Sequence, residues 1–223
     1  LTLTRRVFGR STVGGYMLNR ESFDKAEHTP GQYRRNAGLE TLFISTDGKW
    51  NGWLTHHRSF QPEANNQNWW GNSGFTYSTR KFNILVDALH MGKNYEADMG
   101  FETRIRNYDV LRDTTVRIGY NFVFVESKYR IFFNNTSSRL NFIEIGASNF
   151  QVLNPDGSLN ESSNNFGAEW NFKNTSTIKL SLNPNYAHVP VSFKFDKETD
   201  LTACPPLPAG EYRFINGNAS WSS

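Results

Sequence analysis

Two adjacent tryptophans, Trp69 and Trp70, lie in an amide-rich segment, with Asn68 before them and Asn72 shortly after. Aromatic rings beside amides can bind sugars, because the ring stacks on the apolar C–H face of the sugar while the amides hydrogen-bond its hydroxyls. Tryptophan also gathers at membrane–water interfaces, where this pair would anchor a loop. We favour the interfacial anchor and keep these four residues as the candidates for binding a glycan.

The histidines and the cysteine show no arrangement that binds a metal. His56 and His57 are adjacent, so in a strand they point to opposite faces and cannot readily share an ion. Cys204, the only cysteine, lies in a proline-rich run with no base or metal ligand nearby in the sequence. We therefore predict no metal site and read Cys204 as an inert thiol.

Carboxylates pair only within polar segments, at Glu96 and Asp98 and at Asp196, Glu198 and Asp200. Glycoside hydrolysis requires two carboxylates on either side of the scissile bond, and the sequence places no two of these across a substrate. Solvated loop charge is the simpler interpretation. No serine nucleophile elbow, phosphate-binding loop or dinucleotide fingerprint is present, so the sequence identifies no catalytic residue, and we predict no cofactor.

The charge balance also excludes a class of partner. The 223 residues carry 24 basic and 21 acidic side chains, a net charge of +3 that is dispersed along the chain. Nucleic-acid-binding proteins gather basic residues into a patch or stripe. We therefore expect no nucleic-acid partner.

Apolar and polar residues alternate with a period of two over long stretches between Thr114 and Lys179. Successive side chains of a strand point to opposite faces, so each stretch predicts a strand with one apolar face and one polar face. Mean hydropathy is −0.61, and the polar face includes Arg117, Glu169 and Lys179. We predict that the apolar set faces lipid: Val116, Ile118, Tyr120, Phe122, Phe124, Phe166, Trp170, Phe172, Ile178, Leu180 and Leu182.

These strands are long for a soluble sheet, and no stretch has the 3.6-residue period of a helix. We expect strands at 6–19, 35–46, 49–60, 74–80, 81–91, 103–111, 114–126, 128–135, 138–152, 164–173, 175–183 and 210–222. Short turns at 47–48, 126–128 and 173–175 alternate with longer loops at 20–34, 61–73, 92–102, 153–163 and 184–209. This alternation predicts an all-β fold, an antiparallel up-and-down transmembrane β-barrel or a segment of one.

Some strands are apolar on both faces. Within 81–91, Phe82, Ile84 and Val86 share one face, yet Leu85 and Leu89 lie on the other. A soluble barrel such as a lipocalin has the same period of two, with its apolar face turned inward. For the membrane barrel, we expect a loop or neighbouring segment to cover such two-sided strands from within.

Four segments carry a resemblance to a known family: 10–15 (RSTVGG), 36–40 (NAGLE), 94–104 (NYEADMGFETR) and 207–214 (LPAGEYRF). Together they resemble the domain-of-unknown-function 5916 family, found mainly in Bacteroidota. The resemblance implies an outer-membrane barrel that usually follows a domain similar to family 9 carbohydrate-binding modules. That domain has no counterpart here, and family members continue with further strands, so we expect residues 1–223 to be one incomplete barrel region.

Three hypotheses follow. The first is an integral protein of the bacterial outer membrane, in contact with lipid and completed by further strands or other outer-membrane proteins. It would serve transport, assembly or the anchoring of glycan-handling proteins. The second is a soluble or surface barrel that binds glycan through Trp69 and Trp70. The third, suggested by the family context alone, is a glycoside-active enzyme.

Overall fold

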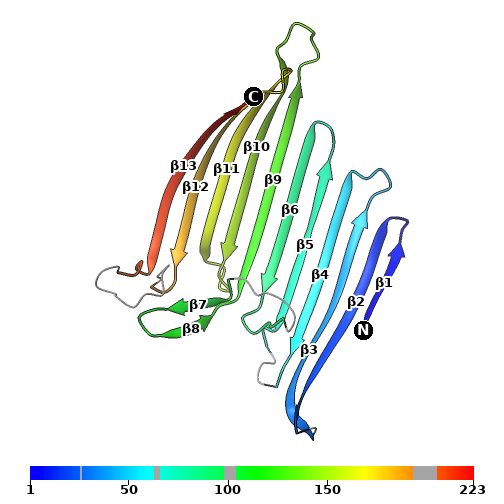
Figure 1. The fold of residues 1–223 in the computed structure, drawn as a ribbon, viewed down its shortest axis with the longest axis vertical. Coiled ribbons are helices and arrows are strands. Elements are labelled where there is room, and N and C mark those ends of the chain that lie inside the picture. Colours follow the sequence, from blue (N-terminus) through cyan, green and yellow to red (C-terminus); the bar gives the residue numbers. More distant parts are fainter. Residues whose placement is uncertain (26, 63–65, 98–103, 193–204) are drawn as a thin grey trace.

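The computed structural model describes the chain except residues 26, 63–65, 98–103 and 193–204, and all regular structure in it is β. One sheet of 11 antiparallel strands follows the chain order (Figure 1). Each of its strands pairs with the next strand along the chain, except that β6 pairs with β9. A separate hairpin of two short strands, β7 and β8, lies between β6 and β9. The predicted all-β, antiparallel, up-and-down fold is confirmed.

Most strands of the sheet are ten residues or longer. In chain order the elements are β1 (Thr2–Val7), β2 (Ser11–Asp24), β3 (Glu27–Ile44), β4 (Trp50–Phe60), β5 (Trp69–Ser78), β6 (Phe82–Met91), β7 (Arg106–Asp109), β8 (Thr114–Arg117), β9 (Tyr120–Phe132), β10 (Leu140–Leu153), β11 (Leu159–Phe172), β12 (Thr177–Val189) and β13 (Gly210–Ser222).

Local turn chemistry fixes where the strands reverse. In the β3–β4 turn, the Asp47 carboxylate accepts hydrogen bonds from the Ser45 hydroxyl (2.7 Å) and the Lys49 amide (3.1 Å). Gly48 has a φ of 72°, a left-handed conformation that glycine adopts at little cost. Residues 154–157 form the turn between β10 and β11 in the same way, with Gly157 at a φ of 86°. The turn at 47–48 was predicted from sequence, and the turn at 154–157 lies within the predicted loop at 153–163.

The connections at one end of the sheet are short: 8–10, 45–49, 79–81, 133–139 and 173–176. At the other end, 92–119 and 190–209 are long and 61–68 is slightly longer than 133–139, whereas the β2–β3 and β10–β11 connections are short. The 92–119 connection includes the β7–β8 hairpin. The predicted loops at 20–34 and 153–163 are wrong, because β2, β3 and β11 extend through most of those residues. Cross-strand hydrogen bonding holds these polar stretches extended where composition alone indicated loops.

Other predicted strands and turns are also wrong. The expected strand 114–126 is divided between β8 of the separate hairpin and β9 of the sheet. The expected strand 6–19 is split by a turn at Phe8–Arg10, where Phe8 has a φ of 48° and Gly9 a φ of 76°. The expected turn at 126–128 lies inside β9, where Glu126 pairs with Leu85 and Lys128 with Asn83. Long β6 and β10 strands on either side supply ladder partners to every residue there, so pairing overrides the polar turn composition.

The sheet is open. Figure 1 shows β1 and β13 at opposite sides of the molecule, and the described pairings end at these two strands. Because 11 strands alternate in direction, β1 and β13 run the same way. They therefore could not close an all-antiparallel wall by pairing with each other. Among the described residues, no helix is long and apolar enough to cross a membrane.

Candidate functional site

The register divides the sheet into an apolar face and a polar face. On the apolar face, Leu54, Phe166, Leu182 and Ile215 are 55%, 54%, 50% and 68% exposed, so nothing in the described chain covers them. Asp, Glu, Lys and Arg are absent from this face over the described residues 13–19, 37–43, 50–56, 69–77, 82–90, 123–131, 143–151, 162–172, 178–188 and 215–221.

Aromatic residues gather at both ends of the apolar face. Near the short turns, the Trp50 ring lies 4.5 Å from Tyr77, and Tyr77 lies 6.4 Å from Phe82. Near the long loops, Trp69 stacks on His90 with ring centroids 3.8 Å apart. Membrane barrels show this pattern, an apolar band between two aromatic girdles.

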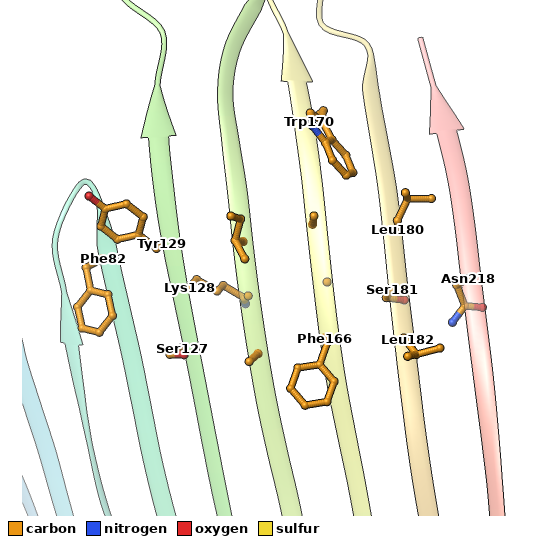
Figure 2. A pocket seen from close by; sticks show the side chains of 15 residues that line it. Phe82, Ser127, Lys128, Tyr129, Phe166, Trp170, Leu180, Ser181, Leu182 and Asn218 are labelled. Atoms are coloured by element: carbon orange, nitrogen blue, oxygen red, sulfur yellow. The ribbon is translucent and has the colours of Figure 1, made fainter.

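Figure 2 shows part of this face in detail, across β6 and β9 to β13. Phe82, Tyr129, Phe166, Leu180 and Leu182 surround a shallow depression whose floor is formed by small residues such as Gly146 and Ala147. The large side chains stand apart from one another and fill no common core. Soluble monomers rarely leave an apolar surface that extends across several strands uncovered.

The residues predicted to face lipid divide into three groups. Phe166, Trp170, Phe172, Ile178, Leu180 and Leu182 share the apolar face. Tyr120, Phe122 and Phe124 lie on the opposite face, in line with Glu126 and Lys128. Val116 belongs to the separate β7–β8 hairpin, and Ile118 lies between β8 and β9. The prediction fails in β9 because residues 122–125 are apolar at both parities, and the register places Val123 and Val125, not Phe122 and Phe124, on the apolar face.

Tyr120 and Phe122 are covered from within by a segment that we call the inner strap, residues 92–97 and 104–105. Tyr95 and Ile105 of the strap are 5% and 0% exposed and form a core with Met91, Tyr120 and Val152. Leu89, Trp70, Phe122 and Phe150 pack against this core. The expectation that a loop covers the two-sided strand at 81–91 is therefore confirmed for Leu89.

Polar contacts hold the inner strap across the sheet. Arg117 donates to the carbonyl oxygens of Lys93 (2.9 Å) and Tyr95 (2.8 Å), and the Glu96 amide donates to the Ser59 hydroxyl (3.1 Å). Glu96 Oε2 lies 3.1 Å from Arg34 Nη1, an ion pair without hydrogen-bond alignment, and Glu96 Oε1 lies 3.6 Å from Arg117. The strap thus covers the polar face at the long-loop end.

Farther from the strap, ion pairs cross the strands of the polar face. Arg130 of β9 contacts Glu144 of β10 (2.5 Å), and Glu169 of β11 contacts Lys179 of β12 (2.8 Å). Glu169 and Lys179 lie on the polar face, as the sequence predicted. On the apolar face, the polar contact near the long loops is an uncharged one, between the side-chain amides of Asn149 and Asn164 (2.6 Å). Charge is thus concentrated on one side of the sheet.

The predicted Trp69–Trp70 binding loop is a strand, because both residues open β5 and point to opposite faces. Asn68 is 3% exposed and donates to the Ser59 carbonyl oxygen, so its amide has a structural role. Trp70 and Asn72 share the polar face, two residues apart. Trp69 stacks on His90 on the apolar face, near its long-loop end.

The sheet joins Trp70 and Asn72 to residues that the sequence did not single out. Trp53 of β4 donates its indole N–H to Asp87 Oδ1 of β6 (3.3 Å), and Asn72 donates to the same oxygen (2.7 Å). His57 Nε2 lies 3.0 Å from Glu40 Oε1. Trp53 and Asp87 are 34 residues apart, and only the pairing of β4, β5 and β6 brings them together.

The other sequence candidates stay dispersed. His56 and His57 lie on opposite faces, and the described residues hold no cluster of three or more histidines, cysteines or acids suited to a metal. Glu96 belongs to the inner strap. Asp98, Asp196, Glu198, Asp200 and Cys204 lie outside the described residues.

Comparison with known proteins gave no relative: no family profile, no curated protein sequence and no solved structure matches this chain.

Proposed function

We propose that this chain forms part of the wall of a β-barrel in the bacterial outer membrane. The observation that carries the proposal is the apolar face, which is free of Asp, Glu, Lys and Arg across the middle of ten strands and edged by aromatic residues. Lipid is the environment in which such a face is stable, and the charged face then lines a watery interior.

Strand length supports the same proposal. A membrane strand needs about 9–11 residues when tilted about 45°. The strands from β4 to β13 that belong to the sheet have 10 to 14 residues, enough to cross the hydrocarbon region. A soluble barrel turns its apolar face into a packed core, whereas here that face is exposed.

Completing the wall requires further strands. An unpaired sheet edge in lipid leaves backbone N–H and C=O groups without partners. Since β1 and β13 run the same way, an odd number of additional antiparallel strands would close the wall between them. The additional strands would pair with β1 and β13 of the described sheet. The resemblance to a family of longer barrels favours such additional strands.

Adjacent substitutions in β12 test the membrane proposal. Leu182→Lys places a charge on the apolar face, and Ser181→Lys places the same charge on the polar face. A lysine at the middle of the lipid face costs about 2–4 kcal/mol, so Leu182→Lys should reduce folding into lipid vesicles strongly while Ser181→Lys folds as the parent does.

The measurement is the urea midpoint of folding in vesicles, read by a gel-mobility shift. Equal effects of the two lysines would contradict the proposal. So would a parent chain that is a stable monomer in water without detergent, since its apolar face would then have to be buried against the protein itself.

A further inference from the structure

Three aromatic rings on the polar face lie over glycines of neighbouring strands. A Cβ added at Gly74 would lie 2.4 Å from the Trp53 ring, and one added at Gly38 would lie 2.4 Å from His57 and 2.5 Å from Tyr16. The rings therefore occupy the space above the glycine backbone and rest against the sheet. Trp53 and Trp70 remain half-buried rather than buried, whereas the His57 side chain is only 14% exposed.

Trp70 extends this aromatic surface along β5. Tyr16, Gly38, His57 and Trp70 are directly paired across β2, β3, β4 and β5, with Tyr16–His57 and His57–Trp70 ring centroids 5.0 and 4.8 Å apart. Trp53 lies four residues from His57 along β4. Four residues of strand span about 13 Å, so the two tryptophans bracket an extended stretch of the face.

Acceptor groups lie near the tryptophans: Asn72 and Glu40 lie between them in the register, and Asp87 lies level with Trp53. Trp53 and Asn72 both donate to Asp87 Oδ1, and Asp87 Oδ2 has no hydrogen-bond donor among the described residues. Asn72 uses its amide nitrogen for Asp87 and the Ala88 carbonyl oxygen, which leaves its amide oxygen open. Glu40, 59% exposed in its side chain, contacts His57 through Oε1 alone.

We propose that Trp53, Trp70, Asn72, Asp87 and Glu40 form a binding track for a neutral oligosaccharide. The indole faces stack on the apolar faces of sugar rings, and the open oxygens of Asp87, Asn72 and Glu40 accept hydrogen bonds from hydroxyls. This inference deepens the proposed function, because it assigns a ligand to the interior face of the barrel wall.

The spacing favours a sugar chain over an organic cation. A cation is held when several aromatic faces lie within about 6 Å of it. Here the tryptophans are separated by about 13 Å of strand, too far to contact one small ion together. An oligosaccharide spans that distance, and the hydroxyls between its rings match the acceptors between the tryptophans. The inner strap packs against Trp70 and ends the track on that side.

Isothermal titration of the detergent-solubilised chain with maltohexaose, cellohexaose and xylohexaose tests the proposal. At least one hexaose should bind. Asp87→Asn preserves size but removes a charged acceptor, and should weaken that binding about tenfold or more. Trp53→Ala removes a stacking surface and should weaken it by a similar factor. Trp53→Phe retains a stacking surface and should bind within a few-fold of the parent, which checks that Trp53→Ala acts through the ring.

Matched controls come from residues outside the track. Glu126→Gln removes a carboxylate from the same face in β9, and Trp50→Ala removes a tryptophan from the apolar face of β4; both should bind the hexaose as the parent does. No binding of any hexaose, equal binding by Asp87→Asn, or tighter binding of tetramethylammonium than of every hexaose would overturn the proposal.

Failure of this inference and failure of the membrane proposal give different results. Suppose the chain is soluble without detergent and binds a hexaose, and Asp87→Asn abolishes that binding. This result would support the binding track and contradict the membrane proposal. Suppose instead that the parent chain folds into vesicles, Leu182→Lys blocks this folding, and no hexaose binds to the parent. This result would support the membrane proposal and contradict the binding track.

Discussion

At the scale of single residues, glycine and aromatic side chains decide how the polar face is built. Gly38 is buried beneath the Tyr16 and His57 rings, and Gly74 lies beneath Trp53, with the Val86 carbonyl oxygen 2.4 Å from where a Cβ would stand. Glycine in a strand usually weakens it, since it offers no side chain to pack. Here the neighbouring ring supplies the missing contact, so these glycines are positions that accept no larger residue.

Gly38→Ala tests this arrangement. The added methyl group would overlap two rings, so the substitution should destabilise the fold by about 1–3 kcal/mol, the usual cost of overpacking. Gly217→Ala is the matched control, because the nearest atom to its Cβ is a carbonyl oxygen at 4.0 Å. Urea unfolding in detergent micelles measures both, and equal stability of Gly38→Ala and the parent would contradict the ring placement.

The Asp47 turn makes a pH-dependent contribution. Hydrogen bonds from Ser45 and Lys49 lower the pKa of the Asp47 carboxyl from 3.8 to about 2. A lowered folded-state pKa means that the ionised form stabilises the turn above pH 3.8 and that this stabilisation is lost as pH falls towards 2. Hydrogen exchange of the Lys49 amide should therefore show constant protection from pH 7 to 4, after correction for intrinsic rates, and decreasing protection below.

Asp47→Asn is the control for this titration. The asparagine side chain does not ionise, so the change in Lys49 protection below pH 4 should disappear. A pH profile that is the same in Asp47→Asn and the parent would show that another group controls the turn.

At the scale of elements, pairing partners override local composition. Glu126, Ser127 and Lys128 read as a polar turn, yet β6 and β10 pair with all three and keep β9 continuous. The same effect extends β2, β3 and β11 into segments expected to be loops. Only long-range contacts carry this information, and for that reason strand boundaries were the weakest part of the sequence interpretation.

Site-directed labelling along β9 distinguishes the two assignments. Single cysteines from residue 123 to 131, each in a Cys204→Ser background, carry an environment-sensitive fluorophore in vesicles. A continuous strand predicts apolar emission at 123, 125, 127, 129 and 131 and polar emission at the residues between them. A turn at 126–128 would break the period of two, with several consecutive polar positions.

At the scale of the whole molecule, the sheet separates an apolar surface from a charged one but leaves both edges unpaired. The edges β1 and β13 lie on opposite sides in Figure 1, and exposed hydrophobic residues such as Trp221, 73% exposed, reach the β13 edge. An edge of this kind is a template for another strand. The two unpaired edges support the proposal that the sheet is a wall segment to which further strands add.

A spin-label distance checks the open arrangement. Labels at Arg6 in β1 and Ser220 in β13, in detergent and in the Cys204→Ser background, are separated by ten strand spacings, about 48 Å along the sheet. Curvature shortens the straight line between them, but it should stay far above the roughly 5 Å of paired strands. Labels at Arg6 and Thr12, which are paired across β1 and β2, give the short reference distance. A short Arg6–Ser220 distance would mean that the chain closes on itself.

The sequence by itself determined the fold class and the two-faced character of the strands, because a period of two is a local property that every strand expresses. It also determined that β11 and β12 place Phe166, Trp170, Leu180 and Leu182 on one side. The tertiary structure decided which side Phe122 and Phe124 take, how the inner strap covers Leu89, and that Trp53 and Asp87 meet. Those outcomes depend on register between strands far apart in the chain, and a shift of one residue would reverse every face.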